Sequence, residues 1–250
     1  MELTKKALLK IPKIEFPKID LSKYLPKKTA MPELKIGDLV IKTPIIQGGM
    51  GVRVSLSNLA SAVANEGGIG VIAANAIGMD ETDYYENGKE ANIRALRKEI
   101  RKARSLTSGV IGVNIMVALN DFSELLEVAI EESADIVFLG AGLPLKDIPI
   151  DKIKVSKIKI VPIVSSGRAA SLIFRFWDKN FDRIPDAVVV EGPKAGGHLG
   201  FSEVQISDPA YQLEKIVPEV IQAVSVYESK RQTTIPVIAA GGVFTGDDIF

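Results

Sequence analysis

The only histidine of the 250-residue chain, His198, lies in a glycine-rich loop, and this makes it the first candidate for chemistry. It follows Gly196 and Gly197 in the stretch AVVVEGPKAGGHLGF, residues 187–201, directly after an apolar run. Imidazole titrates near neutral pH, so His198 could act as a general base. The adjacent glycines would let a ligand approach the backbone. Because a lone histidine is often structural, these residues leave both interpretations open.

Small or polar residues also stand at the ends of other apolar runs. Asn114 lies inside such a run, where an unsatisfied amide costs free energy, and a polar ligand or partner would explain it. Gln47 and Glu191 raise the same question at run ends, where solvent could also satisfy them. Glycines at such ends can bring backbone N–H groups close to a flat ligand or a phosphate, although a glycine pair can equally form only a tight turn. The further candidates of this kind are Gly49, Met50, Gly51, Asn75, Gly241 and Gly242.

Seven apolar, β-branched runs determine where these candidates would lie. Short continuous runs suit strands that are buried on both faces, as in a parallel sheet. The runs span residues 44–47, 68–74, 110–116, 135–141, 158–166, 186–192 and 235–242. Segments with helical periodicity predict helices over residues 55–68, 88–106, 121–134, 167–180 and 208–229, and a weaker one over 144–157. A short hairpin that turns at Gly37–Asp38 precedes the series.

Two of the predicted helices carry capping signals at their first residues. Ser55 is a possible N-cap of the helix over 55–68. Asp121 followed by Glu124 fits a capping box before the helix over 121–134.

Strand and helix alternate, which predicts an α/β fold, either an open doubly wound sheet or a closed TIM (β/α)8 barrel. A doubly wound sheet normally has G-x-G-x-x-G after its first strand, and QGGMGVRVS does not match. The leading hairpin suits a plug at the bottom of a barrel. We therefore expect a TIM barrel with its site in the loops after the strands. Only seven strands are counted, so the barrel is expected to be truncated after strand 7, without its C-terminal part.

We expect two regions along the chain. Residues 1–32 are predicted to be an extended arm rich in proline and lysine, because Pro12, Pro17 and Pro26 forbid a long helix there. The arm could pack on the domain, contact a second subunit of a homodimer, or remain a solvated tail. Residues 33–250 are predicted to be the barrel domain.

Composition argues against several classes of function. The 31 basic and 31 acidic residues give a net charge of zero, which removes the electrostatic argument for nucleic acid or an anionic membrane. No apolar run reaches the roughly 18 residues of a membrane span, and the N-terminus lacks the features of a secretory signal. Without cysteine, thiolate catalysis is impossible, and no metal site is expected from a single histidine. A chain free of cysteine fits a reducing compartment, and we expect it to be cytoplasmic.

Five stretches, in their order and spacing, resemble the nitronate monooxygenase family, formerly called 2-nitropropane dioxygenases. They are PIIQGGMG, GGIGVIAA, GVNIM, EGPKAGGHLGF and IPVIAAGGV. The resemblance runs from about residue 33 to the end of the sequence. It implies a TIM barrel that holds FMN non-covalently. It also implies an enzyme that uses O₂ to oxidise alkyl nitronates or nitroalkanes to carbonyl compounds and nitrite.

The resemblance also implies roles for particular residues. Gly49, Met50 and Gly51 would place backbone against the isoalloxazine ring, and Asn75 and Asn114 would lie near the ring or the ribityl chain.

Toward the other end of the chain, the resemblance implies that Glu191, at a position that is often Gln in relatives, would contact the cofactor. Gly196 and Gly197 would let their loop approach FMN, and Gly241–Gly242 would bind its phosphate end. His198 matches the catalytic histidine of the family, which would take the acidic C–H proton of a nitroalkane or hydrogen-bond the nitro group of a nitronate.

Two other functions remain open at this point. Close relatives of the family are FMN-dependent enoyl-acyl-carrier-protein reductases, which would use NAD(P)H. A phosphate-binding barrel without flavin, acting as an isomerase or a binding module, belongs to a different class.

Overall fold

The computed structural model describes residues 31–249, which belong to one compact unit of alternating strands and helices. Almost all of the predicted arm over residues 1–32 lies outside the described residues, so it stays a prediction. The helices are α1 (Ser57–Asn65), α2 (Gly88–Leu106), α3 (Phe122–Glu131), α4 (Ile150–Val155), α5 (Gly167–Phe181), α6 (Glu203–Ile206) and α7 (Leu213–Arg231), with 3-10 turns η2 (Pro209–Tyr211) and η3 (Gly246–Asp248).

The strands form a two-stranded hairpin and a six-stranded parallel sheet. The antiparallel hairpin is β1 (Leu34–Ile36) and β2 (Leu39–Ile41), as predicted. The parallel strands are β3 (Gly70–Ala73), β4 (Ile111–Met116), β5 (Ile136–Gly140), β6 (Lys159–Val164), β7 (Val188–Glu191) and β8 (Val237–Ala240).

The six parallel strands pair strictly in chain order, β3-β4-β5-β6-β7-β8. The predicted strand over 44–47 is reduced to one parallel bridge, between Ile46 and Ile69. It adds a seventh parallel segment beside β3. A doubly wound sheet would reverse its strand order at a switch point, whereas a barrel keeps chain order. The barrel-type α/β fold is therefore confirmed, as a curled sheet in which β8 is an edge among the described residues.

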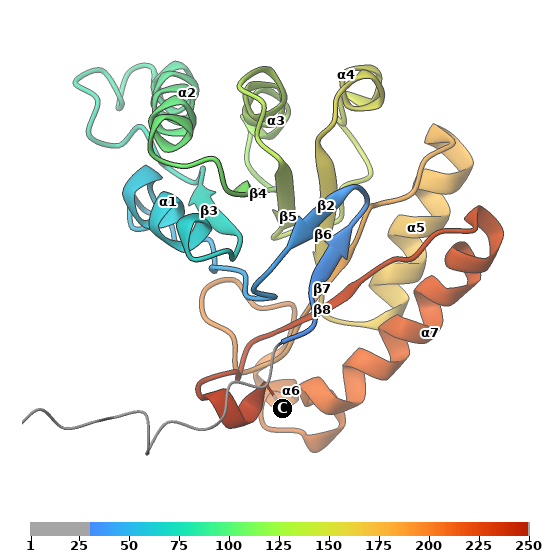
Figure 1. Cartoon of the computed structure of the whole chain (residues 1–250). Helices are drawn as coiled ribbons and strands as arrows, with labels where there is room; N and C mark the ends of the chain where they lie inside the picture. Colours follow the sequence, from blue (N-terminus) through green and yellow to red (C-terminus); the bar gives the residue numbers. More distant parts are fainter. Residues whose placement is uncertain (1–30, 250) are drawn as a thin grey trace, which may run out of the picture. The chain divides into compact units, whose positions relative to one another are not determined.

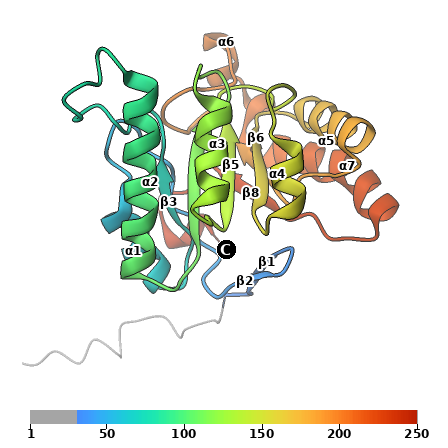
Figure 2. The same ribbon diagram turned by 90° about the horizontal axis from the view of Figure 1, so that it is seen from above.

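Helices and hairpin lie on opposite faces of the sheet. Figure 1 shows α1, α2, α3, α4, α5 and α7 in an arc outside the strands, with the hairpin on the inner side. An outer apolar cluster, which includes Leu96, Phe174 and Trp177, packs the helices against the sheet. The inner cluster consists of Ile36, Ile41, Ile69, Val71, Ile136, Phe138, Val161, Ala187 and Val189. Figure 2 shows that the hairpin closes one end of the sheet and that α6 lies at the opposite end.

Alternation along the strands explains the two clusters. In β5, Ile136 and Phe138 belong to the inner cluster, and Val137 and Leu139 belong to the outer one. Successive side chains of a strand point to opposite faces, so a strand buried on both faces must be apolar throughout. This is the physical reason why the continuous apolar runs correctly indicated strands.

The amino ends of the strands, with the hairpin, form a face on which polar groups are paired; we call it the amino-end face. Asp135 accepts the N–H of Ile111 at 2.7 Å and pairs with Arg104 at 2.8 Å.

Asp186 repeats the arrangement two strands further on. It accepts the N–H of Ile160 at 2.8 Å and pairs with Arg183 at 2.9 Å. The hairpin is held there by an ion pair between Lys159 and Asp38 at 2.5 Å.

The predicted N-cap Ser55 is wrong, and the predicted N-cap Asp121 has the right position but does not form a capping box. The N-cap of α1 is Leu56, and the N–H of Ser57 is accepted at 2.9 Å by the buried carboxylate of Glu99 on α2. Asp121 is the N-cap of α3 but makes no side-chain cap bond; it accepts instead from the Asn92 amide at 2.8 Å. Contacts between helices have replaced the local caps.

The helix predicted over 208–229 is divided in the structure. Pro209 opens the 3-10 turn η2, where the Asp208 side chain accepts from the Ala210 N–H at 2.9 Å, and α7 begins only at Leu213. No described helix is long and apolar enough to cross a membrane.

Candidate active site

The carboxyl ends of the parallel strands, together with the loops that follow them, form the rim opposite the hairpin. Val189 of β7 belongs to the inner cluster, and side chains two residues apart share a face of a strand. Glu191 therefore faces inward at the end of β7. The same alternation places Asn114 inward, because Val110 packs on the inner cluster from the start of β4. Two of the predicted site residues thus stand above the inner apolar cluster.

Glu191 is half-buried, and its carboxyl group has no hydrogen bond or ion pair with any described residue. Its backbone pairs with Ala240 of β8. On the other side of β7, Val164 of β6 pairs with Val190. Ser165, at the end of β6, therefore lies beside Glu191. Burial raises the pKa of the Glu191 carboxyl above its usual range, because little water is left to stabilise its charge.

The loop after the first parallel segment lies over two predicted asparagines. A Cβ built on Gly49 would stand 2.4 Å from the Asn114 Cβ, and one on Gly51 would stand 3.2 Å from the Asn75 Nδ2. Only a glycine allows this approach at position 49. Met50 between them is 45% exposed. The structure thus brings together Gly49, Met50, Gly51, Asn75 and Asn114.

Gln47 holds this loop in place. Its Nε2 donates to the Ser55 Oγ and to the Val71 carbonyl, each at 2.9 Å. Ser55 also accepts the Met50 N–H at 3.0 Å. The Gln47 amide is therefore satisfied by protein groups rather than by solvent or a ligand. Its role is to shape the loop.

Gly241 and Gly242 lie against the turn that follows β7. Both have positive φ, +84° and +100°. A Cβ on Gly241 would approach the Ala195 Cβ to 2.8 Å, and one on Gly242 would approach the Lys194 Cδ to 3.3 Å. Among the described residues, the N–H groups of Gly241, Gly242 and Val243 find no acceptor. Consecutive free N–H groups beside a lysine suit an anion.

The loop that carries His198 is attached to the rim at both ends. At one end the Gly192 N–H donates to the Ala240 carbonyl at 2.8 Å, and at the other the Ser165 hydroxyl donates to the Gly200 carbonyl at 3.3 Å. Between them a Cβ on Gly196 or Gly197 would meet nothing within 4 Å.

His198 itself is exposed and makes no hydrogen bond with the described residues. The candidate residues thus form two groups at one end of the sheet, one around Asn114 and one around Gly241. No hydrogen bond joins His198 to either group.

Two rim residues are not among the predicted site residues. Ser165 stands beside Glu191 at the end of β6, and Lys194 lies against Gly242. The alternation of inward residues along β6, from Val161 through Ile163, would have marked Ser165. The sequence left Lys194 open, as a solvated loop lysine or as a partner for an anionic ligand, because its position depends on the turn.

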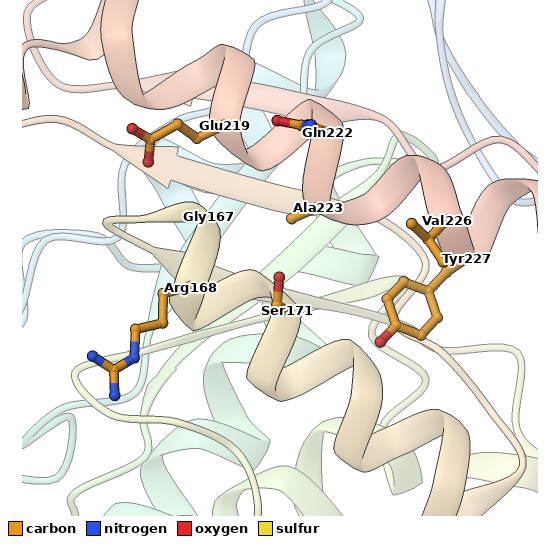
Figure 3. A pocket seen from close by; sticks show the side chains of 8 residues that line it. All are labelled: Gly167, Arg168, Ser171, Glu219, Gln222, Ala223, Val226 and Tyr227. Carbon is orange, nitrogen blue, oxygen red and sulfur yellow. The ribbon is translucent and has the colours of Figure 1, made fainter.

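Two hollows in the described part of the chain lie away from the rim residues. One of about 450 Å³ lies between α5 and α7 on the outer side; Figure 3 shows Arg168, Ser171, Glu219 and Tyr227 around it. A second, of about 420 Å³, lies on the amino-end face beside Arg183 and Asp186. Neither is lined by a candidate site residue.

Comparison with known proteins places the chain in a family. The model of the nitronate monooxygenase family matches residues 33–133 and 119–250. A probable nitronate monooxygenase of Staphylococcus aureus is 28% identical over 233 residues, with 83% of this chain and 60% of that protein covered. A Mycobacterium tuberculosis protein, named (3aS,4S,5R,7aS)-5-hydroxy-7a-methyl-1-oxo-octahydro-1H-indene-4-carboxyl-CoA dehydrogenase, is 29% identical over 206 residues, with 82% of this chain and 47% of that protein covered.

Solved structures agree with the fold. FabK from Thermotoga maritima has 31% identity and a TM-score of 0.61, with 84% of this chain and 54% of that chain covered. A nitroalkane oxidase from Streptomyces ansochromogenes, at 23% identity and TM-score 0.61, shares the fold, with 82% of this chain and 60% of that chain covered. The chain spans about half to three fifths of the length of the relatives it matches.

The named monooxygenase and dehydrogenase are both oxidoreductases. The family model covers nearly all of the described residues. The matched residues include every strand of the parallel sheet and the helices that pack on it. The chain therefore belongs to the nitronate monooxygenase family, a family of flavin-dependent oxidoreductases.

Proposed function

We propose that the protein is an FMN-dependent nitronate monooxygenase whose flavin binds along the carboxyl-end rim. The observation that carries the proposal is the meeting of glycine-bearing loops and unpaired polar side chains at one end of the sheet, in a chain of this family. In barrels of parallel strands, this is the end where catalysis occurs.

The residues of the rim suit FMN in three respects. The free N–H groups of Gly241, Gly242 and Val243, beside Lys194, provide donors and positive charge for a phosphate. Asn114 and Glu191 face inward with unpaired polar atoms that a ribityl chain or a ring could engage. Gly48, Gly196 and Gly197 leave space, since a Cβ on any of them would meet nothing within 4 Å.

We assign the proton transfer to His198. A nitroalkane carries an acidic C–H beside its nitro group, and a neutral imidazole can accept that proton at working pH. An exposed histidine can then release the proton to water. When bound, FMN would supply the electron transfer that leads, with O₂, to a carbonyl compound and nitrite. For a substrate supplied as the nitronate anion, His198 would only hydrogen-bond the nitro group.

Nitrite release tests this proposal. The full-length protein, reconstituted with FMN, is expected to release nitrite from propyl nitronate under O₂ without NAD(P)H. A protein that remains colourless with excess FMN would contradict the cofactor assignment. A yellow protein that releases no nitrite would contradict the reaction alone.

An enoyl-thioester reductase is the second candidate function. It is favoured by the relatives that are named as dehydrogenases of a carboxyl-CoA compound, which is a thioester. Oxidation of NAD(P)H that depends on an enoyl thioester, without nitrite release from nitronate, would identify this activity. The barrel without flavin would leave the purified protein colourless. Cytoplasmic location and a homodimer remain predictions from the sequence.

A further inference from the structure

Glu191 is a carboxyl group that the proton transfer assigned to His198 does not use. It is fixed at the end of β7 by the ladder to β8, where its backbone pairs with Ala240. The side chain faces inward, two residues beyond Val189 of the inner cluster.

No described residue forms a hydrogen bond or an ion pair with the Glu191 carboxyl group. Its neighbours across the sheet are Ser165 and Ala240, which are uncharged. No described Lys or Arg forms an ion pair with it. A half-buried carboxylate without a hydrogen bond or a counter-ion is costly, whereas a neutral carboxylic acid can both stay buried and donate a hydrogen bond.

Other titratable groups near β7 do not change this conclusion. β8 carries no charged side chain. The charged or titratable side chains on the other elements around β7 are Lys159 at the amino end of β6, Lys194 and His198 in the following loop, and Glu214, Lys215, Glu219, Tyr227, Glu228, Lys230 and Arg231 on α7. The pKa of Glu191 is raised by burial alone, and none of these groups contributes to the shift.

We propose that Glu191 acts in the site as a neutral carboxylic acid, which donates its proton in a hydrogen bond to an acceptor atom on the ring system of the flavin. This inference rests on the proposed function, because it presupposes flavin on the rim. It adds that the protein binds flavin in its protonated form. Ionisation of Glu191 removes the donor and places a negative charge beside the ring acceptor.

The consequence is a link between proton binding and flavin affinity. If only the protonated form binds, the dissociation constant rises about tenfold for each pH unit above the pKa of Glu191 in the free protein. Glu191→Gln keeps the shape and a permanent N–H donor, so it removes this pH dependence. Glu191→Leu removes the donor as well, and its affinity is expected to be about fivefold weaker than that of Glu191→Gln at every pH.

The test is a titration of flavin fluorescence with the full-length protein between about pH 5 and pH 9. FMN and riboflavin are used separately, because riboflavin has no phosphate that titrates. Glu214→Gln, an exposed change on α7, is the matched control and is expected to follow the wild type. His198 and Lys194 are present in every variant, so the comparison of the wild type with Glu191→Gln changes position 191 alone.

We expect the wild type and Glu214→Gln to lose affinity for both flavins as pH rises, while Glu191→Gln does not. Equal pH profiles for the wild type and Glu191→Gln would overturn the inference while leaving flavin binding intact. So would equal affinity of Glu191→Leu and Glu191→Gln. Absence of binding in every variant would overturn the proposed function as well. Thermal unfolding of each variant identifies any that does not fold, and the wild type and Glu191→Gln suffice for the decision.

Discussion

The two ends of the parallel sheet differ in how their polar groups are satisfied. On the amino-end face, Asp135 and Asp186 each accept a strand N–H and pair with an arginine. On the rim, Asn114, Glu191 and His198 have no side-chain hydrogen bond with the described residues. Paired groups lower the free energy of the folded chain, and unpaired groups are available to a ligand.

Glycines show the same contrast. A Cβ on Gly37, in the hairpin turn, would lie 3.0 Å from the Lys159 Cε, whereas one on Gly48 or Gly196 would meet nothing within 4 Å. At Gly37 the amino-end face is filled, whereas at Gly48 and Gly196 the rim is open. This division agrees with barrels of parallel strands generally, in which one face serves stability and the other carries the site. Four substitutions test the division, from the largest expected effect to the smallest.

His198→Asn should affect activity without affecting stability. Loss of a general base is expected to slow turnover of a neutral nitroalkane about 100- to 10,000-fold. Turnover of a pre-formed nitronate should be largely retained, since no proton has to be removed. Because His198 is exposed and unpaired, the free energy of unfolding should change by less than about 0.5 kcal/mol. Nitrite assays and urea denaturation measure the two effects, and turnover of the neutral nitroalkane at the wild-type rate would refute the assignment.

Asp186→Ala should lower stability without affecting the site. It leaves the N–H of Ile160 and the guanidinium of Arg183 without their shared partner, and we expect a loss of about 2–3 kcal/mol in the free energy of unfolding. FMN affinity of the folded protein should be unchanged. Asp151→Ala, an exposed aspartate of α4, is the control and should cost less than about 0.5 kcal/mol. A weaker FMN affinity in Asp186→Ala would show that the two ends are coupled.

Gly37→Ala and Gly48→Ala together compare a glycine that neighbouring atoms crowd with one that faces open space. Gly37 has φ +59°, where an alanine costs about 1–2 kcal/mol, and the new methyl group would also press on Lys159. Gly48→Ala is the control, because its φ is not positive and its Cβ would meet open space. That change should be neutral or slightly stabilising. Equal destabilisation by both substitutions, in urea denaturation, would contradict the contrast between the ends.

Glu191→Gln should stabilise the protein without ligand at neutral pH. Burial raises the pKa of Glu191 in the folded protein, so the folded state holds its proton more tightly than the unfolded chain. The free energy of unfolding therefore falls as pH rises from the unfolded pKa through the folded one, and stays lower above it. Glutamine removes this loss. Urea denaturation at a series of pH values measures it, and a wild type whose stability is insensitive to pH in that window, relative to Glu191→Gln, would contradict the effect.

The sequence predicted the strands better than the partners of polar side chains. Six of the seven apolar runs contain the observed parallel strands, and the helix over 88–106 has the observed bounds. The run 44–47 was predicted as a strand and forms only one bridge. The roles assigned to site residues remain predictions, although the structure brings Gly49 to Asn114 and Gly51 to Asn75.

The positions of the parallel strands along the chain were determined by the sequence alone, because a strand buried on both faces must be apolar throughout and each such run is local. The order in which the strands pair was decided by the tertiary structure. The contacts of Ser55, Asp121 and Gln47 were decided only by the tertiary structure. A helix cap is worth about 1 kcal/mol, and a hydrogen bond between distant segments is worth about as much. Packing determines which donors and acceptors come within reach, so no local pattern could choose between them.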